Sequence, residues 1–140
     1  MSKNKDREAI VAIIEEMAAS MSGEQSTRHW AEDTLWFDIP AFASRGIKPA
    51  LRFFDQAFSG LQSCKIDILE METVITESMA CAFTVQRIAT TSKDGTTNKP
   101  LIVRQTDCFE KRNGEWKVIH EHTSVAKGAE WDGKITTEQV

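Results

Sequence analysis

The sequence predicts an α+β domain in which helices come first and a sheet of long antiparallel strands follows. Apolar side chains recur every three or four residues up to about position 61, which indicates helices. After position 63 they alternate with polar ones, which indicates strands. Asn113-Gly114 is the strongest short hairpin signal, because both central residues of a type I′ turn adopt positive φ.

The first helix is predicted over residues 6–21, where an apolar stripe includes Ile10, Ile14 and Met17. A short second helix, capped by Ser26 or Thr27, is predicted to run through residues 29–32. A short strand over residues 34–39 then ends at Pro40, which cannot donate to a sheet.

A third helix is predicted over residues 47–61, because Pro49 suits a first helical turn and an apolar stripe follows it. Four long strands are then predicted, over residues 64–76, 79–91, 99–111 and 115–125. Strands of this length exceed the usual five or six residues, so the sheet is expected to curl around the long helix. Its open mouth is expected to hold a ligand-sized pocket.

Composition limits the function classes. The chain of 140 residues carries 17 basic and 21 acidic residues, a formal charge of −4, which argues against binding a nucleic-acid backbone. No apolar run is long enough for a signal peptide or a membrane helix, and the three cysteines form no Cys-x-x-Cys pair. We therefore expect one cytoplasmic domain over residues 1–126, followed by a polar tail over 127–140.

The stretch from Arg104 to Ser124 resembles the terminal hairpin of SnoaL-like proteins in its R-x-T, G-x-W and H-x-H-x-S spacing. These proteins belong to the nuclear transport factor 2-like, or cystatin-like, superfamily. The same spacing resembles the association domain of calmodulin-dependent protein kinase II. The resemblance covers roughly residues 6–126 and implies an α+β cone, with N-terminal helices packed in the concave face of a strongly curved antiparallel sheet.

Asp38 is the first candidate catalytic residue. The segment Trp36-Phe37-Asp38-Ile39-Pro40 resembles ketosteroid isomerases, in which an Asp at this position is the general base. Apolar surroundings raise the pKa of a carboxyl group toward the range useful for proton abstraction. A capping or turn role before Pro40 is the alternative. The chain contains no tyrosine, so an oxyanion hole of the ketosteroid isomerase type is not expected.

His120 and His122 are the other candidate catalytic residues. They lie two apart on a predicted strand and therefore share a face, where we expect them in one row with Trp116, Val118 and Ser124. Three roles stay open. The pair could act in acid–base chemistry, could be satisfied structurally across the sheet, or could bind zinc with His29 or Asp38 as a further ligand. No metal or cofactor is expected.

Arg104 and Thr106 share one face of their strand, and Gln105 and Asp107 share the other. Which face is concave stays open, because a single bulge would exchange them.

Arg87 is expected as a buried cation that pairs with Asp38, Glu70 or Glu72. The full set of expected pocket residues is Trp30, Trp36, Phe42, Phe54, Arg87, Arg104, Thr106, Asp107 and Ser124.

These observations lead to two functional hypotheses. The first is a cofactor-free SnoaL-like protein that binds a hydrophobic small molecule in the cone and isomerises, cyclises or dehydrates it by acid–base chemistry. The second is a non-enzymatic dimerisation or ligand-binding module similar to the kinase association domain. Both are compatible with a homodimer formed through the sheet face.

Overall fold

The computed structural model describes residues 2–39 and 42–125. Three helices and two strands come first in the chain, and four long strands follow them. The elements are α1 (Ser2–Ala18), α2 (Gly23–Thr27), β1 (Trp30–Asp38), β2 (Phe42–Arg45), α3 (Ile47–Ser59), β3 (Leu61–Ile75), β4 (Met79–Ser92), β5 (Leu101–Arg112) and β6 (Glu115–Ser124).

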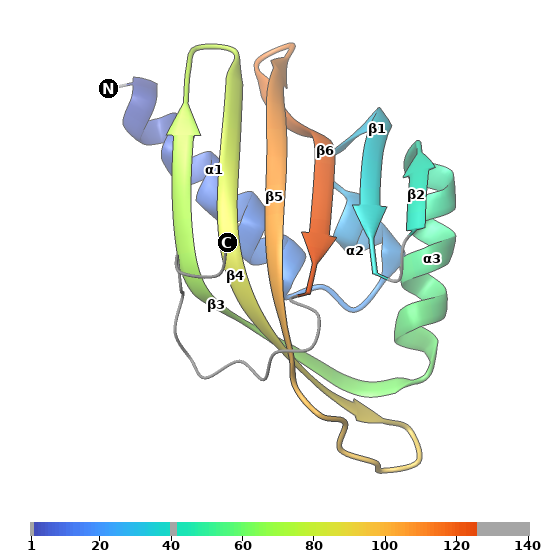
Figure 1. Ribbon diagram of the computed structural model, residues 1–140. Coiled ribbons are helices and arrows are strands. Elements are labelled where there is room, and N and C mark those ends of the chain that lie inside the picture. Colours follow the sequence, from blue (N-terminus) through green and yellow to red (C-terminus); the bar gives the residue numbers. More distant parts are fainter. Residues whose placement is uncertain (1, 40–41, 126–140) are drawn as a thin grey trace.

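The strands form one mixed sheet in the order β2-β1-β6-β5-β4-β3. The four long strands make the predicted antiparallel meander, and β1 joins it by pairing parallel with β6. Helix α1 crosses one face of this sheet and α3 lies beside β2 (Figure 1). We call the face that packs against the helices the inner face, and the opposite one the outer face. The α+β cone predicted from the sequence is confirmed.

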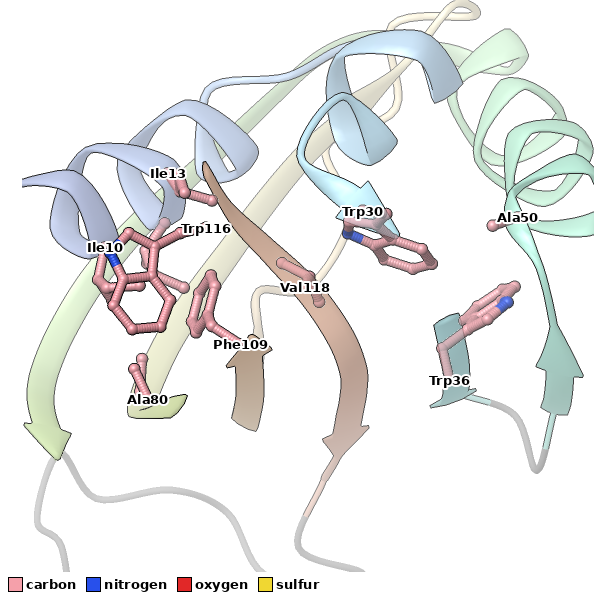
Figure 2. Packing of buried hydrophobic residues seen from close by; sticks show 11 residues of the cluster. Ile10, Ile13, Trp30, Trp36, Ala50, Ala80, Phe109, Trp116 and Val118 are labelled. Atoms are coloured by element: carbon pink, nitrogen blue, oxygen red, sulfur yellow. The ribbon is translucent and has the colours of Figure 1, made fainter. Parts of the chain in front are cut away.

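The core occupies one half of the inner face. Ile10 and Ile14 of α1 are fully buried, as their helical stripe predicted. Ile10 lies near Phe109 and Trp116 of the sheet (Figure 2). Val118 lies between this group and a second one beside α3 (Figure 2).

The second group of core residues is aromatic. Trp36 of β1 has no exposed surface and stacks on Phe54 of α3, with ring centroids 5.6 Å apart. Trp30 meets both rings edge to face. These contacts hold β1 against α3, and they fix the strand that carries Asp38.

The second helix and the first strand differ from the prediction. Ser22 caps α2, because its hydroxyl accepts a hydrogen bond from the Gln25 N–H at 3.2 Å, so the helix ends at Thr27 instead of beginning there. Trp30 consequently begins β1 and is not helical. Strand β2 was not predicted. Helix α3 and the Asn113-Gly114 turn, with φ of 52° and 79°, follow the prediction.

No helix within residues 2–39 and 42–125 is long and apolar enough to cross a membrane. The polar tail expected over residues 127–140 lies outside the described residues.

Candidate functional site

The inner face of the sheet changes from apolar to polar along its strands. Beyond the core, six inward-facing side chains of β4, β5 and β6 carry hydroxyl, amide or carboxyl groups, and all but one of the six are buried. We call this set the inner polar patch: Thr84, Gln86, Gln105, Asp107, Glu121 and Thr123. Burial of so many polar groups is costly unless they satisfy one another, which directs attention to their contacts.

A bulge in β6 places the last members of this patch. Phe109 pairs with Val118, whereas the preceding Cys108 pairs with His120, so Ile119 is an extra residue in the ladder. The extra residue reverses the alternation of β6. Glu121 therefore faces inward, on the same side as Val118, and His120 faces outward.

Two carboxylic acids meet at the centre of the patch. Asp107 and Glu121 are opposite one another in register, they are 0% and 5% exposed, and their side chains are hydrogen-bonded to each other. Burial raises the pKa of both groups. The negative charge of Asp107, and then that of Asp38, raise the pKa of Glu121 further, to well above its ordinary range. Because two adjacent carboxylates resist joint ionisation, the pair keeps a proton to higher pH than an isolated carboxyl group does.

Asp38 lies at the edge of the patch, at the end of β1. Strand alternation puts it on the same face as Trp36, which is the register neighbour of Glu121. Burial raises the pKa of Asp38 to about 6, although its Oδ1 accepts a hydrogen bond from the Ile39 N–H at 2.6 Å. A carboxyl group in this range is ionised at neutral pH and is still a competent base.

Neutral side chains hold the acid pair. Gln105 Nε2 donates to Asp107 Oδ2 at 2.8 Å, and Thr123 Oγ1 donates to Gln105 Oε1 at 3.2 Å. In the neighbouring strand, Gln86 Nε2 donates to Thr84 Oγ1 at 2.8 Å. Thr84 Oγ1 in turn donates to the backbone carbonyl oxygen of Gln105 at 3.3 Å. The patch is thus a connected polar network in which the two acids are the titratable members.

The two histidines lie on the outer face. They flank Phe37, whose ring centroid is 4.9 Å from that of His120 and 5.3 Å from that of His122. His120 Nδ1 lies 2.7 Å from the Leu35 carbonyl oxygen, which can only accept, so Nδ1 carries the proton. The expected row with Trp116 and Val118 is wrong, because the bulge at Ile119 separates them. The structure does not bring Asp38 and His122 together.

The remaining polar pocket residues are also on the outer face. Arg104 donates to Ser124 Oγ at 3.2 Å, and Thr106 is in register with His122. Arg87 is partly exposed and lies opposite Asp67, so the expected pairing of a buried Arg87 with Asp38, Glu70 or Glu72 is not seen.

Of the aromatic residues expected in the pocket, three line the inner face as core residues: Trp30, Trp36 and Phe54. The side chain of Phe42 lies outside the described part of the structure.

Two hollows lie elsewhere on the molecule. One, of about 270 Å³, is on the outer face over Glu72, Phe83 and Arg104. The other, of about 350 Å³, lies between the end of α1 and the first half of β3, beside Cys64. Neither of these two hollows includes Asp38 or the acid pair.

A metal role for the histidines gains no support. Within residues 2–39 and 42–125, no three His, Cys, Asp or Glu side chains are grouped so that they could hold a metal ion.

Sequence reasoning missed Glu121, Gln105 and Thr123. The bulge that turns Glu121 inward leaves only a weak signal, namely two adjacent apolar residues, Val118 and Ile119, within an otherwise alternating strand. Gln105 was assigned correctly to the face of Asp107, although no role was given to it.

A family model described as a SnoaL-like domain matches residues 8–128 of the chain. The chain belongs to the SnoaL-like domain family. This match extends over most of α1, over α2, α3 and the whole sheet, and it includes every residue of the inner polar patch. No curated protein matches the sequence.

Solved structures share the fold of this SnoaL-like protein. A nuclear transport factor 2-like superfamily protein from Salmonella enterica serovar Typhimurium superposes with a TM-score of 0.79 at 17% identity, covering 94% of this chain and 99% of the other. A hexachlorocyclohexane dehydrochlorinase gives 0.77 at 12% identity, covering 88% and 86%. A proposed calcium/calmodulin-dependent protein kinase II association domain from Xanthomonas campestris gives 0.72 at 17% identity, covering 86% and 84%. At these identities the similarity establishes the fold.

Proposed function

We propose that this SnoaL-like protein binds a small, mainly apolar molecule against the inner polar patch and moves protons on it, with Asp38 as the base. One arrangement carries the proposal: Asp38 and the hydrogen-bonded Asp107–Glu121 pair lie on one face, in surroundings that raise their pKa values by different amounts. The pKa of Asp38 is about 6, whereas that of Glu121 is far above its ordinary value. Neighbouring titratable groups with separated pKa values are typical of paired acid and base roles.

The chemistry that this arrangement suits is abstraction of a proton from carbon. Ionised Asp38 would accept the proton from a carbon next to a carbonyl or a leaving group. The acid pair would donate a hydrogen bond or a proton to the oxygen or leaving group where negative charge develops. Return of the proton to another carbon gives isomerisation, and loss of the leaving group gives elimination. Because side chains supply both proton acceptor and donor, neither reaction needs a cofactor.

The aromatic residues next to the patch favour an apolar ligand. Trp36 is the register neighbour of Glu121 in the adjacent strand. The rings of Trp30 and Phe54 pack against the Trp36 ring. A related fold in a dehydrochlorinase supports elimination as one outcome, since removal of HCl requires a base.

Exchange of α-protons in D₂O tests the proposal without knowledge of the natural substrate. A panel of cyclic ketones and β,γ-unsaturated ketones is incubated with the protein, and loss of the α-proton signal is followed by NMR. We expect a rate that rises to a plateau above about pH 6. Asp38→Asn should lower this rate by about 100-fold or more. The control Asp94→Asn alters an exposed turn carboxylate and should leave it unchanged. Equal rates for Asp38→Asn and the native chain would refute the role of Asp38.

A second candidate function is self-association through the outer face. Large apolar side chains are exposed there on neighbouring strands: Val74 at 55%, Phe83 at 43% and Met79 at 39%. Phe37 and the two histidines continue this surface on β1 and β6. We propose that a second copy of the chain covers it, in a twofold dimer. The shared fold with a proposed kinase association domain supports this arrangement.

Light scattering coupled to size-exclusion chromatography tests the dimer. Phe83→Arg should convert it to a monomer that keeps its circular dichroism spectrum. The matched control Leu101→Arg changes a side chain of similar exposure, 41%, at the start of β5, and should leave the dimer intact. A native chain that elutes as a monomer at high concentration would contradict this function.

A further inference from the structure

We infer that Gln105 is a positioning residue, which orients the carboxyl group of Asp107 and thereby assigns the proton of the acid pair to Glu121. The inference deepens the proposed function, on which it rests for its chemical consequence, because it states which acid faces a ligand as the donor. The observation behind it is a chain of contacts that runs from Thr123 through Gln105 to Asp107.

The direction of the Gln105 amide is fixed by its two neighbours. Its Nε2 lies 2.8 Å from Asp107 Oδ2, and its Oε1 receives the hydroxyl of Thr123 at 3.2 Å. The reversed amide would place Oε1 against a carboxyl oxygen and lose the donor to Asp107. Thr123 therefore holds Gln105 with its N–H groups toward the acid.

The contacts of Asp107 then determine where the proton lies. Its Oδ2 accepts from Gln105, and its buried Oδ1 receives no amide or hydroxyl hydrogen from the described residues. The remaining hydrogen-bond partner of Asp107 is the carboxyl group of Glu121, which supplies a proton only if it is the protonated member. Asp107 is thus the acceptor of the pair.

The surrounding charges act in the same direction. The hydrogen bonds from Glu121 and Gln105 and the charge of His120 lower the pKa of Asp107 against the effect of burial. Glu121 instead faces the charges of Asp107 and Asp38, both of which raise its pKa. Glu121 therefore holds the proton, and it is also the member of the pair whose pKa is raised by the charge of Asp38. The proton donor, Glu121, and the base, Asp38, are thus neighbours.

A pH titration of the carboxyl carbons tests this assignment on the full chain, labelled with ¹³C at Asp and Glu and followed by NMR. In Gln105→Leu the titration of Asp107 should move to higher pH, by the roughly tenfold gain in proton affinity that loss of one hydrogen bond to an ionised group produces. Gln86→Leu is the matched control. It removes a buried amide from the same face, one that donates to Thr84 and makes no hydrogen bond to Asp107 among the described residues, and it should leave the titration unchanged.

Thr123→Val gives a second measurement that keeps the Gln105 side chain. It removes the hydroxyl that orients the amide, and we expect a smaller shift in the same direction. A native titration curve for both Gln105→Leu and Thr123→Val, or an equal shift in Gln86→Leu, would overturn the inference. The titration needs no substrate, so its result stands apart from the ketone exchange experiment that decides the role of Asp38.

Discussion

Asp107 of β5 and Glu121 of β6 lie opposite each other in adjacent strands, and their buried carboxyl groups are hydrogen-bonded to one another. Such a pair stabilises the folded chain only while one of its carboxyl groups is protonated, because two buried carboxylates would repel each other. Unfolding exposes both acids to water and returns their pKa values to the ordinary range. The pair therefore couples the stability of the fold to pH.

Glu121→Gln should make the protein less sensitive to alkaline conditions. The folded-state pKa of Glu121 is raised, so the native chain binds its proton more tightly than the unfolded chain and loses stability as pH rises through that range. The glutamine variant retains a donor to Asp107 and has no proton to lose. We expect the free energy of unfolding in urea to fall less between pH 5 and pH 9 than in the native chain. The surface control Glu110→Gln should show the same dependence of unfolding free energy on pH as the native chain. A Glu121→Gln variant with that same pH dependence would contradict the prediction.

Asp38→Asn should stabilise the protein at neutral pH. The pKa of Asp38 is 3.8 in its ordinary state and about 6 in the folded chain, so stability falls as pH rises between these values. At pH 7 the variant should be more stable by up to about 3 kcal/mol. Well below pH 3.8 the difference should disappear, because Asp38 is then protonated in both the folded and the unfolded chain. Denaturant unfolding at the two pH values measures this, and a constant difference would rule out the titration of Asp38 as its cause.

Gly23→Ala should loosen the contact between α2 and α3. A Cβ at Gly23 would lie 2.5 Å from the Leu51 carbonyl oxygen, and the Gly23 N–H that donates to Asp55 Oδ1 would be displaced. We expect a loss of about 1–3 kcal/mol in thermal or urea unfolding. Gly60→Ala is the matched control, since a Cβ there meets no atom within 4 Å, and it should change stability by less than about 0.5 kcal/mol. Equal effects of the two substitutions would contradict the close approach.

Cys108 should be a slow nucleophile. Burial, together with the neighbouring Cys81 thiol 3.8 Å away, raises the pKa of Cys108 to about 11. Because the thiolate is the reactive form, alkylation by iodoacetamide should accelerate about tenfold per pH unit between pH 7 and 9. Cys81→Ser should speed the reaction at fixed pH by removing part of the raising effect. Peptide mass spectrometry resolves the sites, and an alkylation rate independent of pH would contradict the prediction.

Periodicity was sufficient for most of the fold. The meander and α3 follow from side-chain spacing, and the Asn113-Gly114 turn follows from the need for positive φ. The limits of α2 and β1 depend on local hydrogen bonds, which side-chain spacing does not reveal. Ser22, and not Ser26 or Thr27, is the N-cap residue of α2. The helix therefore ends earlier than predicted, and Trp30 belongs to β1.

The candidate site was less accessible to sequence reasoning. Asp38 could be proposed because it follows an apolar strand and a recognisable motif. Glu121 could not, because its direction depends on a bulge that only the pairing of β5 with β6 reveals. The histidines are the conspicuous residues of that strand and were candidate catalytic residues together with Asp38, but the same bulge turns them to the opposite side of the sheet.

The register of β6 matters as much as its composition. If Ile119 lay opposite Cys108 in a regular ladder, strict alternation from Val118 would turn His120 and His122 toward the side of Trp36 and send Glu121 to the solvent side. An acidic interior would become an imidazole-lined one without the substitution of any reactive side chain. A slip of one residue in the pairing of two strands is therefore a route by which one scaffold exchanges its chemical repertoire.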